Sequence, residues 1–185
     1  MQKLVNLLKG DITTLNSDAI VNSANKSLLG GGGLDYIIQK KAGIEMQNEC
    51  RRIHDEIGGS LPNGHAVVTT AGNLPAKFLI HTVGPRWLGG SKNEAEELCN
   101  TYLNSLIKAN EVHAKTVSFP SISTGVYRYP KQEAAEIAIS TVLSILPSFE
   151  YIEHVYFVCF EKDNYDIYHT ILSNLDDPNI QITIA

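Results

Sequence analysis

The chain has 185 residues, of which 43% are hydrophobic, and its formal net charge is −5. A length of this order is typical of one domain with a proper core, and an acidic chain without clustered Lys and Arg is not expected to bind nucleic acids in general. The three cysteines show no spacing typical of a disulfide framework or a zinc site, and neither a signal peptide nor a membrane-spanning run is recognisable. We therefore expect a single domain over residues 1–185 that is cytoplasmic and has no membrane partner.

Strand-like and helix-like segments alternate along the chain. Apolar and β-branched runs predict strands over residues 3–8, 18–21, 65–71, 77–83, 115–119, 154–160 and 180–184. Apolar residues at helical spacing predict helices over residues 34–43, 44–57, 93–110, 130–146 and 164–175. Strands that alternate with helices form an α/β sheet covered on both faces. Because some neighbouring strands lack a long helix between them, we expect strands of mixed direction.

A run of four glycines, Gly30 to Gly33, separates the second predicted strand from the first predicted helix. Asn22 and Asn25 precede the run, and one acid, Asp35, lies in the first turn of the helix. Glycine lets a ligand approach the backbone, and a helix N-terminus offers unpaired N–H groups, so this arrangement is typical of phosphate binding. The run matches neither a dinucleotide fingerprint nor a P-loop. A flexible surface loop with Asp35 as a helix cap is the alternative, but the two amides beside the carboxylate favour a site.

A second loop, rich in Ser, Thr and Gly, covers residues 121–127 after the strand predicted over 115–119. Backbone N–H groups and hydroxyls can hold a diphosphate without Lys or Arg, which fits the acidic composition. Ligands of α/β sheets bind at the carboxyl ends of the strands, so we expect the two loops to face each other across a cleft. A polar surface loop is the alternative. Tyr127 can stack on a sugar in that cleft or fill the core.

Two further residues fit a nucleotide site with less specificity. Asp11 follows Gly10 and can either cap a helix or turn or accept a hydrogen bond from an exocyclic amine. Phe160 ends a predicted strand and can either stack on a base or pack in the core. The six histidines show no ligand spacing and are interpreted as structural. No metal site, cofactor motif or nucleophile elbow is recognisable.

Several motifs together resemble those of a known family. They are Gly10-Asp11-Ile12-Thr13, the loop from Asn22 to Gly33 with Leu34-Asp35 after it, His81-Thr82-Val83-Gly84-Pro85, Ser121 to Tyr127, and Val158-Cys159-Phe160. Their content and order resemble macrodomains, which are ADP-ribose-binding modules. The aspartate at position 35 resembles the hydrolytic MacroD-type branch. The resemblance implies a three-layer α/β/α sandwich with a mixed central sheet of about six strands.

The resemblance also implies roles for individual residues. At the adenine, Asp11 would bind the amine beside the Ile12 backbone, and Phe160 would stack on the ring. The residues that would hold the diphosphate are Gly32, Gly33, Ser121, Ser123, Thr124, Gly125 and Val126. At the distal ribose, Asn25 would bind the sugar with Asn22 nearby, Tyr127 would pack against it, and Asp35 would act on a water. No metal and no cofactor are implied.

The function implied by the resemblance is hydrolysis of an ester on the distal ribose of ADP-ribose. The substrate would be O-acetyl-ADP-ribose or mono-ADP-ribose attached to an acidic side chain of a protein. Two residues depart from the family pattern: Tyr36 follows the aspartate where hydrolytic relatives have glycine, and Arg128 replaces a second glycine. The alternative is a reader module that binds ADP-ribose without chemistry, which Tyr36 would favour by crowding the water. A role in RNA metabolism gains no support from the acidic composition.

Overall fold

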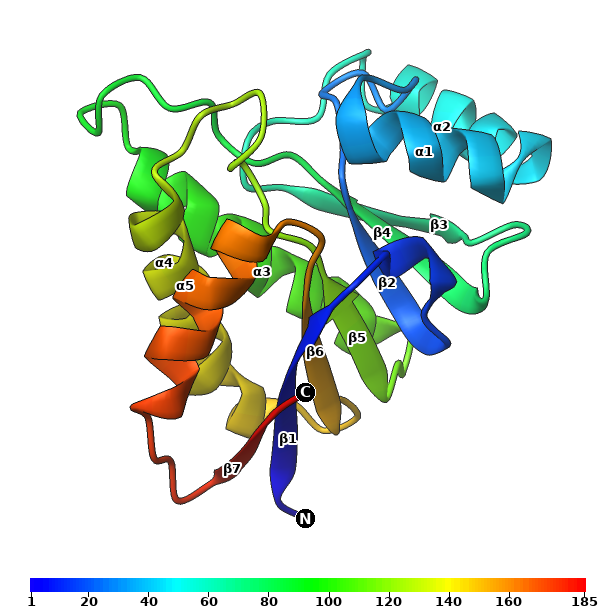
Figure 1. Ribbon diagram of the computed structural model, residues 1–185. Helices are drawn as coiled ribbons and strands as arrows, with labels where there is room; N and C mark the ends of the chain where they lie inside the picture. Colours follow the sequence, from blue (N-terminus) through cyan, green and yellow to red (C-terminus); the bar gives the residue numbers. More distant parts are fainter.

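Seven strands form one continuous sheet in the structure, a computed structural model that describes residues 1–185 (Figure 1). The strands are β1 (Lys3–Lys9), β2 (Ser17–Ser23), β3 (Ala66–Thr70), β4 (Ala76–Thr82), β5 (Thr116–Phe119), β6 (His154–Cys159) and β7 (Ile180–Ile184), in the spatial order β3-β4-β2-β5-β6-β1-β7. All neighbours are parallel except β3 and β4, so the prediction of a mixed sheet is confirmed. The strand number of about six was too low, because β7 returns as a parallel edge strand beside β1.

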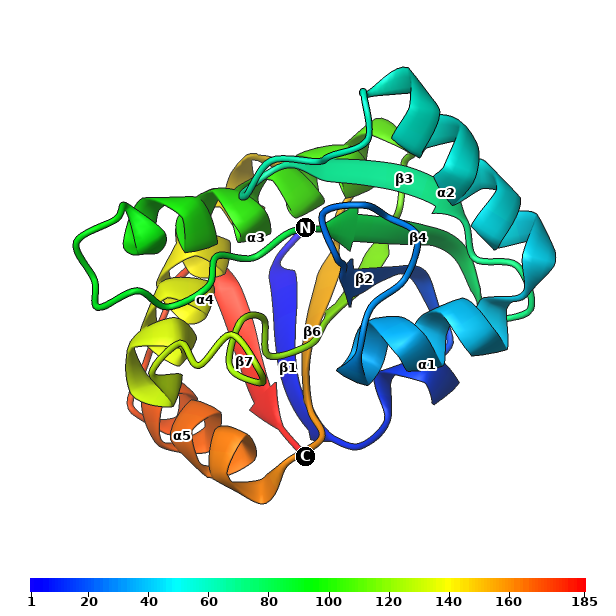
Figure 2. The ribbon, with the colours of Figure 1, turned by 90° about the horizontal axis from the view of Figure 1, so that it is seen from above.

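Five α-helices cover the two faces of this sheet. They are α1 (Gly33–Ala42), α2 (Ile44–Glu56), α3 (Glu94–Glu111), α4 (Lys131–Ile145) and α5 (Lys162–Ser173), and all lie within two residues of the predicted bounds. Helices α1 and α2 lie on one face and α3, α4 and α5 on the other, as two views at right angles show (Figures 1 and 2). The three-layer α/β/α fold is therefore confirmed. Two short 3₁₀ helices, Ile12–Thr14 and Leu146–Ser148, were not predicted.

Alternation along β2 divides the core into two apolar clusters. Ala19 and Val21 face the larger cluster, which α3, α4 and α5 cover, whereas Ile20 faces the smaller cluster beneath α1 and α2. Asn22 has the parity of Ile20, and it is fully buried. A polar side chain is therefore placed in the apolar layer between the sheet and α1. None of the helices combines the length and the apolar composition that crossing a bilayer requires.

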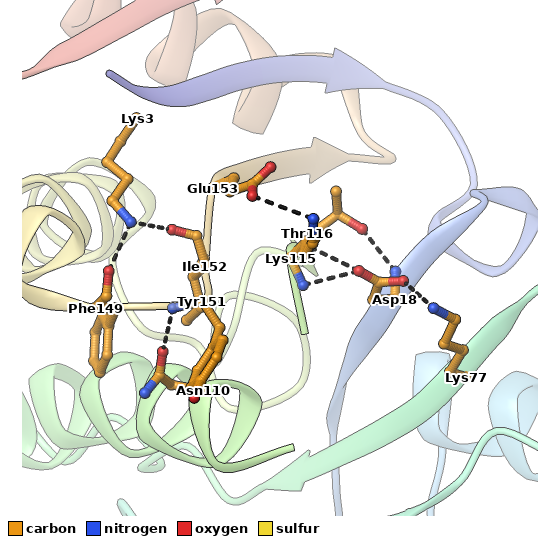
Figure 3. A network of polar contacts seen from close by, with 10 residues as sticks. All are labelled: Lys3, Asp18, Lys77, Asn110, Lys115, Thr116, Phe149, Tyr151, Ile152 and Glu153. Atoms are coloured by element: carbon orange, nitrogen blue, oxygen red, sulfur yellow. Dashed lines mark hydrogen bonds and ion pairs between the residues drawn. The ribbon is translucent and has the colours of Figure 1, made fainter. Parts of the chain in front are cut away.

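Polar contacts hold the amino ends of the central strands together (Figure 3). Asp18, at the start of β2, accepts hydrogen bonds from the backbone N–H groups of Lys115 (2.8 Å) and Thr116 (3.2 Å), and it pairs with Lys77 Nζ at 3.0 Å. Lys3 Nζ, at the start of β1, donates to two carbonyls in the segment before β6. These contacts fix one end of the sheet, and the loops at the opposite, carboxyl end are the ones that carry the sequence motifs.

Candidate active site

A cleft with a volume of about 430 Å³ lies at the carboxyl ends of β2, β4 and β5. Figure 2 looks down on this end of the sheet, where the loop before α1 and the loop before α4 approach each other. The walls of the cleft come from residues 23–25 at the end of β2, residues 31–35 at the start of α1 and Arg86 after β4. The loop after β5 contributes Pro120, Ser121, Ser123, Gly125, Val126 and Tyr127. The volume is in the range of small-molecule sites. The prediction that the two loops face each other across a cleft is confirmed.

The glycine loop exposes its backbone to this cleft. A Cβ at Gly32, or at Gly33 with φ of +60°, would meet no atom within 4 Å, so both residues leave open space for a ligand beside the N-terminus of α1. Gly31 serves a different purpose, because a Cβ there would lie 3.2 Å from both Asp35 Oδ2 and Asn25 Cβ. The absence of a side chain at Gly31 thus lets the loop cross directly over the two polar residues. The sequence showed the glycine run but not this separate role.

The second loop is held in a strained shape. The hydroxyl of Ser123 is buried without a hydrogen-bond partner, and its φ of +67° is left-handed, which costs of order 1–2 kcal/mol for a residue with a Cβ. Backbone bonds fix the loop: Tyr129 N–H donates to Ser123 O at 2.9 Å, and Trp87 N–H donates to Tyr127 O at 2.8 Å. A Cβ at Gly84 would lie 2.2 Å from Ser123 Oγ, so only glycine permits this approach. Strain of this kind is concentrated at functional sites.

Asp35 lines the edge of the cleft and is nearly buried, because only 3% of the residue is exposed. Two hydrogen bonds hold its carboxylate. Its Oδ1 accepts a hydrogen bond from Asn22 Nδ2 at 2.9 Å, and its Oδ2 accepts one from the backbone N–H of Asn25 at 3.0 Å. The interpretation of Asp35 as a helix cap is wrong, because the N-cap residue is Gly32 and no side chain caps α1. The side-chain oxygen of Asn25 accepts the N–H of Ser27 at 3.0 Å, which leaves its amide Nδ2 available to a ligand.

One cation, Arg86, lines the cleft, and no motif in the sequence singles it out. Its guanidinium carbon lies 5.4 Å from the centroid of the Tyr127 ring, a distance typical of a cation–π contact. Tyr127 is partly buried and lines the cleft, so it is not core filler. The only charged side chains at the walls of the cleft are thus the guanidinium of Arg86 and the carboxylate of Asp35.

The residues expected at the adenine lie together beyond the cleft. Asp11 and Phe160 follow two paired strand ends, since Lys9 of β1 is in register with Cys159 of β6. Phe160 is 79% exposed, which excludes packing in the core. Asp11 caps the short helix Ile12–Thr14: Thr13 donates to Asp11 Oδ1 through N–H (2.9 Å) and Oγ1 (2.6 Å), and these bonds lower the pKa of the carboxyl. Asp11 Oδ2 lies 3.2 Å from Lys41 Nζ at the surface.

The sequence-derived candidates therefore fall into two groups. Those that line the cleft are Asn25, Gly32, Gly33, Asp35, Ser121, Ser123, Gly125, Val126 and Tyr127. Those outside its walls are Asp11, Ile12, Asn22, Thr124 and Phe160. Thr124 stabilises the second loop, because its hydroxyl donates a hydrogen bond to Ser121 O at 3.2 Å. Asn22 contacts the site through its hydrogen bond to Asp35 Oδ1. No cluster of three His, Cys, Asp or Glu side chains forms a metal site.

The chain has clear relatives among known proteins. The Macro domain family model matches residues 21–138. A macro domain-containing protein of Acinetobacter sp. is 63% identical over 183 residues, which cover 99% of this chain and 100% of the relative. An O-acetyl-ADP-ribose deacetylase of Escherichia fergusonii is 46% identical over 177 residues, 96% of this chain and 99% of that protein. The solved structure of the Oceanobacillus iheyensis macrodomain with ADP matches at a TM-score of 0.85 and 41% identity, covering 90% of this chain and 88% of that one. The chain belongs to the macrodomain family.

Proposed function

We propose that this protein is an ADP-ribose-binding hydrolase that cleaves an ester on the distal ribose of its ligand. The observation that carries the proposal is the carboxylate of Asp35, buried and fixed by Asn22 and Asn25 at the edge of a glycine-lined cleft. The name of the Escherichia fergusonii relative and the ADP of the Oceanobacillus iheyensis structure support it. The substrates are O-acetyl-ADP-ribose and mono-ADP-ribose esterified to acidic side chains of proteins.

Each part of the ligand has a place in this proposal. The diphosphate binds backbone N–H groups of the glycine loop and of residues 121–126, where Gly32, Gly33 and Gly125 leave open space. The distal ribose lies against Tyr127 and binds the amide of Asn25. The adenine extends beyond the cleft and stacks on Phe160, while Asp11 and the Ile12 backbone bind its polar edge. A ligand spread over this length is held mainly by the diphosphate, which fixes the ester relative to Asp35.

Hydrolysis follows from the position of the carboxylate. A water between Asp35 and the ester carbon gives up a proton to the carboxylate as its oxygen adds to the carbonyl. The bond from that carbon to the ribose oxygen then breaks, and the ribose oxygen takes up a proton. The products are a free carboxylic acid and ADP-ribose. General-base assistance of this kind typically accelerates a reaction by about 10²–10⁴-fold.

The rival interpretation, a reader without catalysis, depended on Tyr36 crowding the water. Tyr36 is 58% exposed, and it does not line the cleft. Its ring therefore leaves the space beside Asp35 open, which favours the enzyme. The expectations of a single domain and of a cytoplasmic location stay predictions from the sequence.

Incubation of the purified protein with O-acetyl-ADP-ribose separates the two interpretations. The proposal predicts release of acetate in repeated turnovers, and calorimetry measures ADP-ribose affinity in the same preparation. Tight binding without any release of acetate would identify a reader and refute the hydrolase. A peptide that carries mono-ADP-ribose on glutamate, tested in parallel, measures whether the protein-linked ester is also a substrate.

A further inference from the structure

A row of three polar side chains crosses the sheet beneath α1 and α2 and ends at Asp35. Thr69 of β3, His81 of β4 and Asn22 of β2 form this row, and Asn22 and His81 are register partners in the parallel ladder. Asn22 and His81 are fully buried, and Thr69 is 3% exposed. Their neighbours on this face, such as Ile20 and Leu79, are apolar. Buried polar groups in such a layer are costly unless they are hydrogen-bonded.

The hydrogen bonds of this row determine the tautomer of His81. The hydroxyl of Thr69 donates to Thr70 O at 2.9 Å, so it is the acceptor in its 2.8 Å contact with His81 Nε2. Nε2 therefore carries the proton, and Nδ1 presents a lone pair. Asn22 Nδ2 lies 3.1 Å from His81 Nδ1 and donates one hydrogen to its lone pair. Its other hydrogen goes to Asp35 Oδ1 at 2.9 Å.

The two acceptors on either side fix the amide of Asn22 in one orientation. A flipped amide would turn Oδ1 toward the carboxylate of Asp35 and toward the Nδ1 lone pair of His81, and both contacts would be repulsive. Orientation of a polar residue by a second residue behind it is known to tune reactive sites. The hydrogen bonds that link Thr69, His81, Asn22 and Asp35 thus hold the carboxylate in a fixed position relative to the sheet.

We propose that His81 is a positioning residue for Asp35, acting through Asn22 in the hydrolysis proposed above, on which this inference rests. Burial lowers the pKa of His81 to about 4, so the ring is neutral around pH 7. The other titratable group against the ring is the Cys50 thiol of α2, 3.7 Å from Nε2, whose pKa burial raises to about 11. Cys50 is therefore also neutral around pH 7, so neither the His81 ring nor the thiol beside it carries a charge.

Two substitutions at His81 and one control test the role. His81→Leu removes the acceptor and is expected to lower kcat by about 10–100-fold, by analogy with the loss of a hydrogen-bond partner behind a metal ligand. Its ADP-ribose affinity should be unchanged, because His81 does not line the cleft. His81→Asn offers Oδ1 where Nδ1 stands and should restore most of kcat. Thr82→Val is the control: Thr82, the next residue of β4, is as buried as His81, and the substitution removes its hydrogen bond to His65 O and should leave kcat unchanged.

A double-mutant cycle with Asn22→Ala tests the route. If His81 acts through Asn22, the double variant is as slow as Asn22→Ala alone. The proposal would be overturned if the double variant lost kcat by the product of the two single losses, or if a folded His81→Leu variant kept the kcat of the wild type.

Imidazole ¹⁵N NMR of the wild type is a test that depends neither on hydrolysis nor on the folding of any variant. It should show that Nε2 of His81 is protonated and that Nδ1 is an acceptor. The opposite tautomer overturns the positioning role. Absence of hydrolysis in the wild type with the expected tautomer would instead refute the proposed function.

Discussion

Replacement of Gly32 by alanine separates ligand binding from stability. Gly32 has an extended backbone with φ of −89°, and a Cβ there would meet nothing within 4 Å, so the free protein accommodates alanine without strain. Alanine lowers the conformational entropy of the unfolded chain relative to glycine, so the substitution should raise the free energy of unfolding by about 0.4–1 kcal/mol. The new methyl group occupies space that the diphosphate needs. Misplaced methyl groups in packed sites cost about 1–3 kcal/mol.

A cost of about 1–3 kcal/mol corresponds to a dissociation constant for ADP-ribose that is roughly 5- to 150-fold higher. Calorimetry gives that constant, and urea denaturation gives the stability. Gly58→Ala is the matched control, because Gly58 lies after α2, outside the cleft walls, and has φ of +80°. It should lose about 1–2 kcal/mol of stability and keep its affinity. An unchanged affinity of Gly32→Ala would refute the placement of the diphosphate beside the glycine loop.

Three further predictions concern charge. The pKa of His81 in the folded protein is about 4, below the ordinary value of 6.5. Between these pH values the unfolded state binds more protons than the folded state. The free energy of unfolding should therefore fall by about 3 kcal/mol as the pH drops from 6.5 to 4. Urea denaturation at several pH values measures this, and an equal slope in His81→Asn would contradict the assignment. Asp18→Ala should lower the free energy of unfolding by about 1–3 kcal/mol, because two backbone N–H groups at the start of β5 lose their acceptor, with kcat unchanged. A loss of kcat at full stability would contradict that purely structural role. Arg86→Ala should weaken ADP-ribose binding by about 2- to 5-fold and reduce its salt dependence, since the one cation of the cleft is lost. Salt titrations by calorimetry that match the wild type would exclude Arg86 from the site.

The fold and the cleft could be predicted because their signals are local. Alternation in β2, the glycine run before α1 and the Ser-Thr-Gly loop after β5 each lie within about ten residues of sequence. The apolar alternation of residues 180–184 indicated the seventh strand, although the resemblance implied about six. The two 3₁₀ helices were missed because a single turn carries little periodicity.

The support behind Asp35 could not be predicted because it depends on strand register. Asn22 and His81 are 59 residues apart in the sequence, and only the pairing of β2 with β4 brings their side chains to 3.1 Å. One signal was present: His81 alternates with Leu79 and Val83 and so takes an apolar position of its strand. For Phe160, a position just beyond a strand end does not determine burial, so stacking and core packing were equally compatible with the sequence.

A single-turnover comparison of the wild type with Asp35→Asn tests the central claim most directly. Each protein is mixed in excess with O-acetyl-ADP-ribose, and proton NMR follows the release of acetate. Binding of ADP-ribose to each protein is measured in the same buffer. Asparagine keeps the size of the side chain and cannot take a proton from water, so the rate of acetate release should fall by about 10²–10⁴-fold while the ligand still binds. Acetate release by Asp35→Asn at the rate of the wild type would contradict the role of this carboxylate.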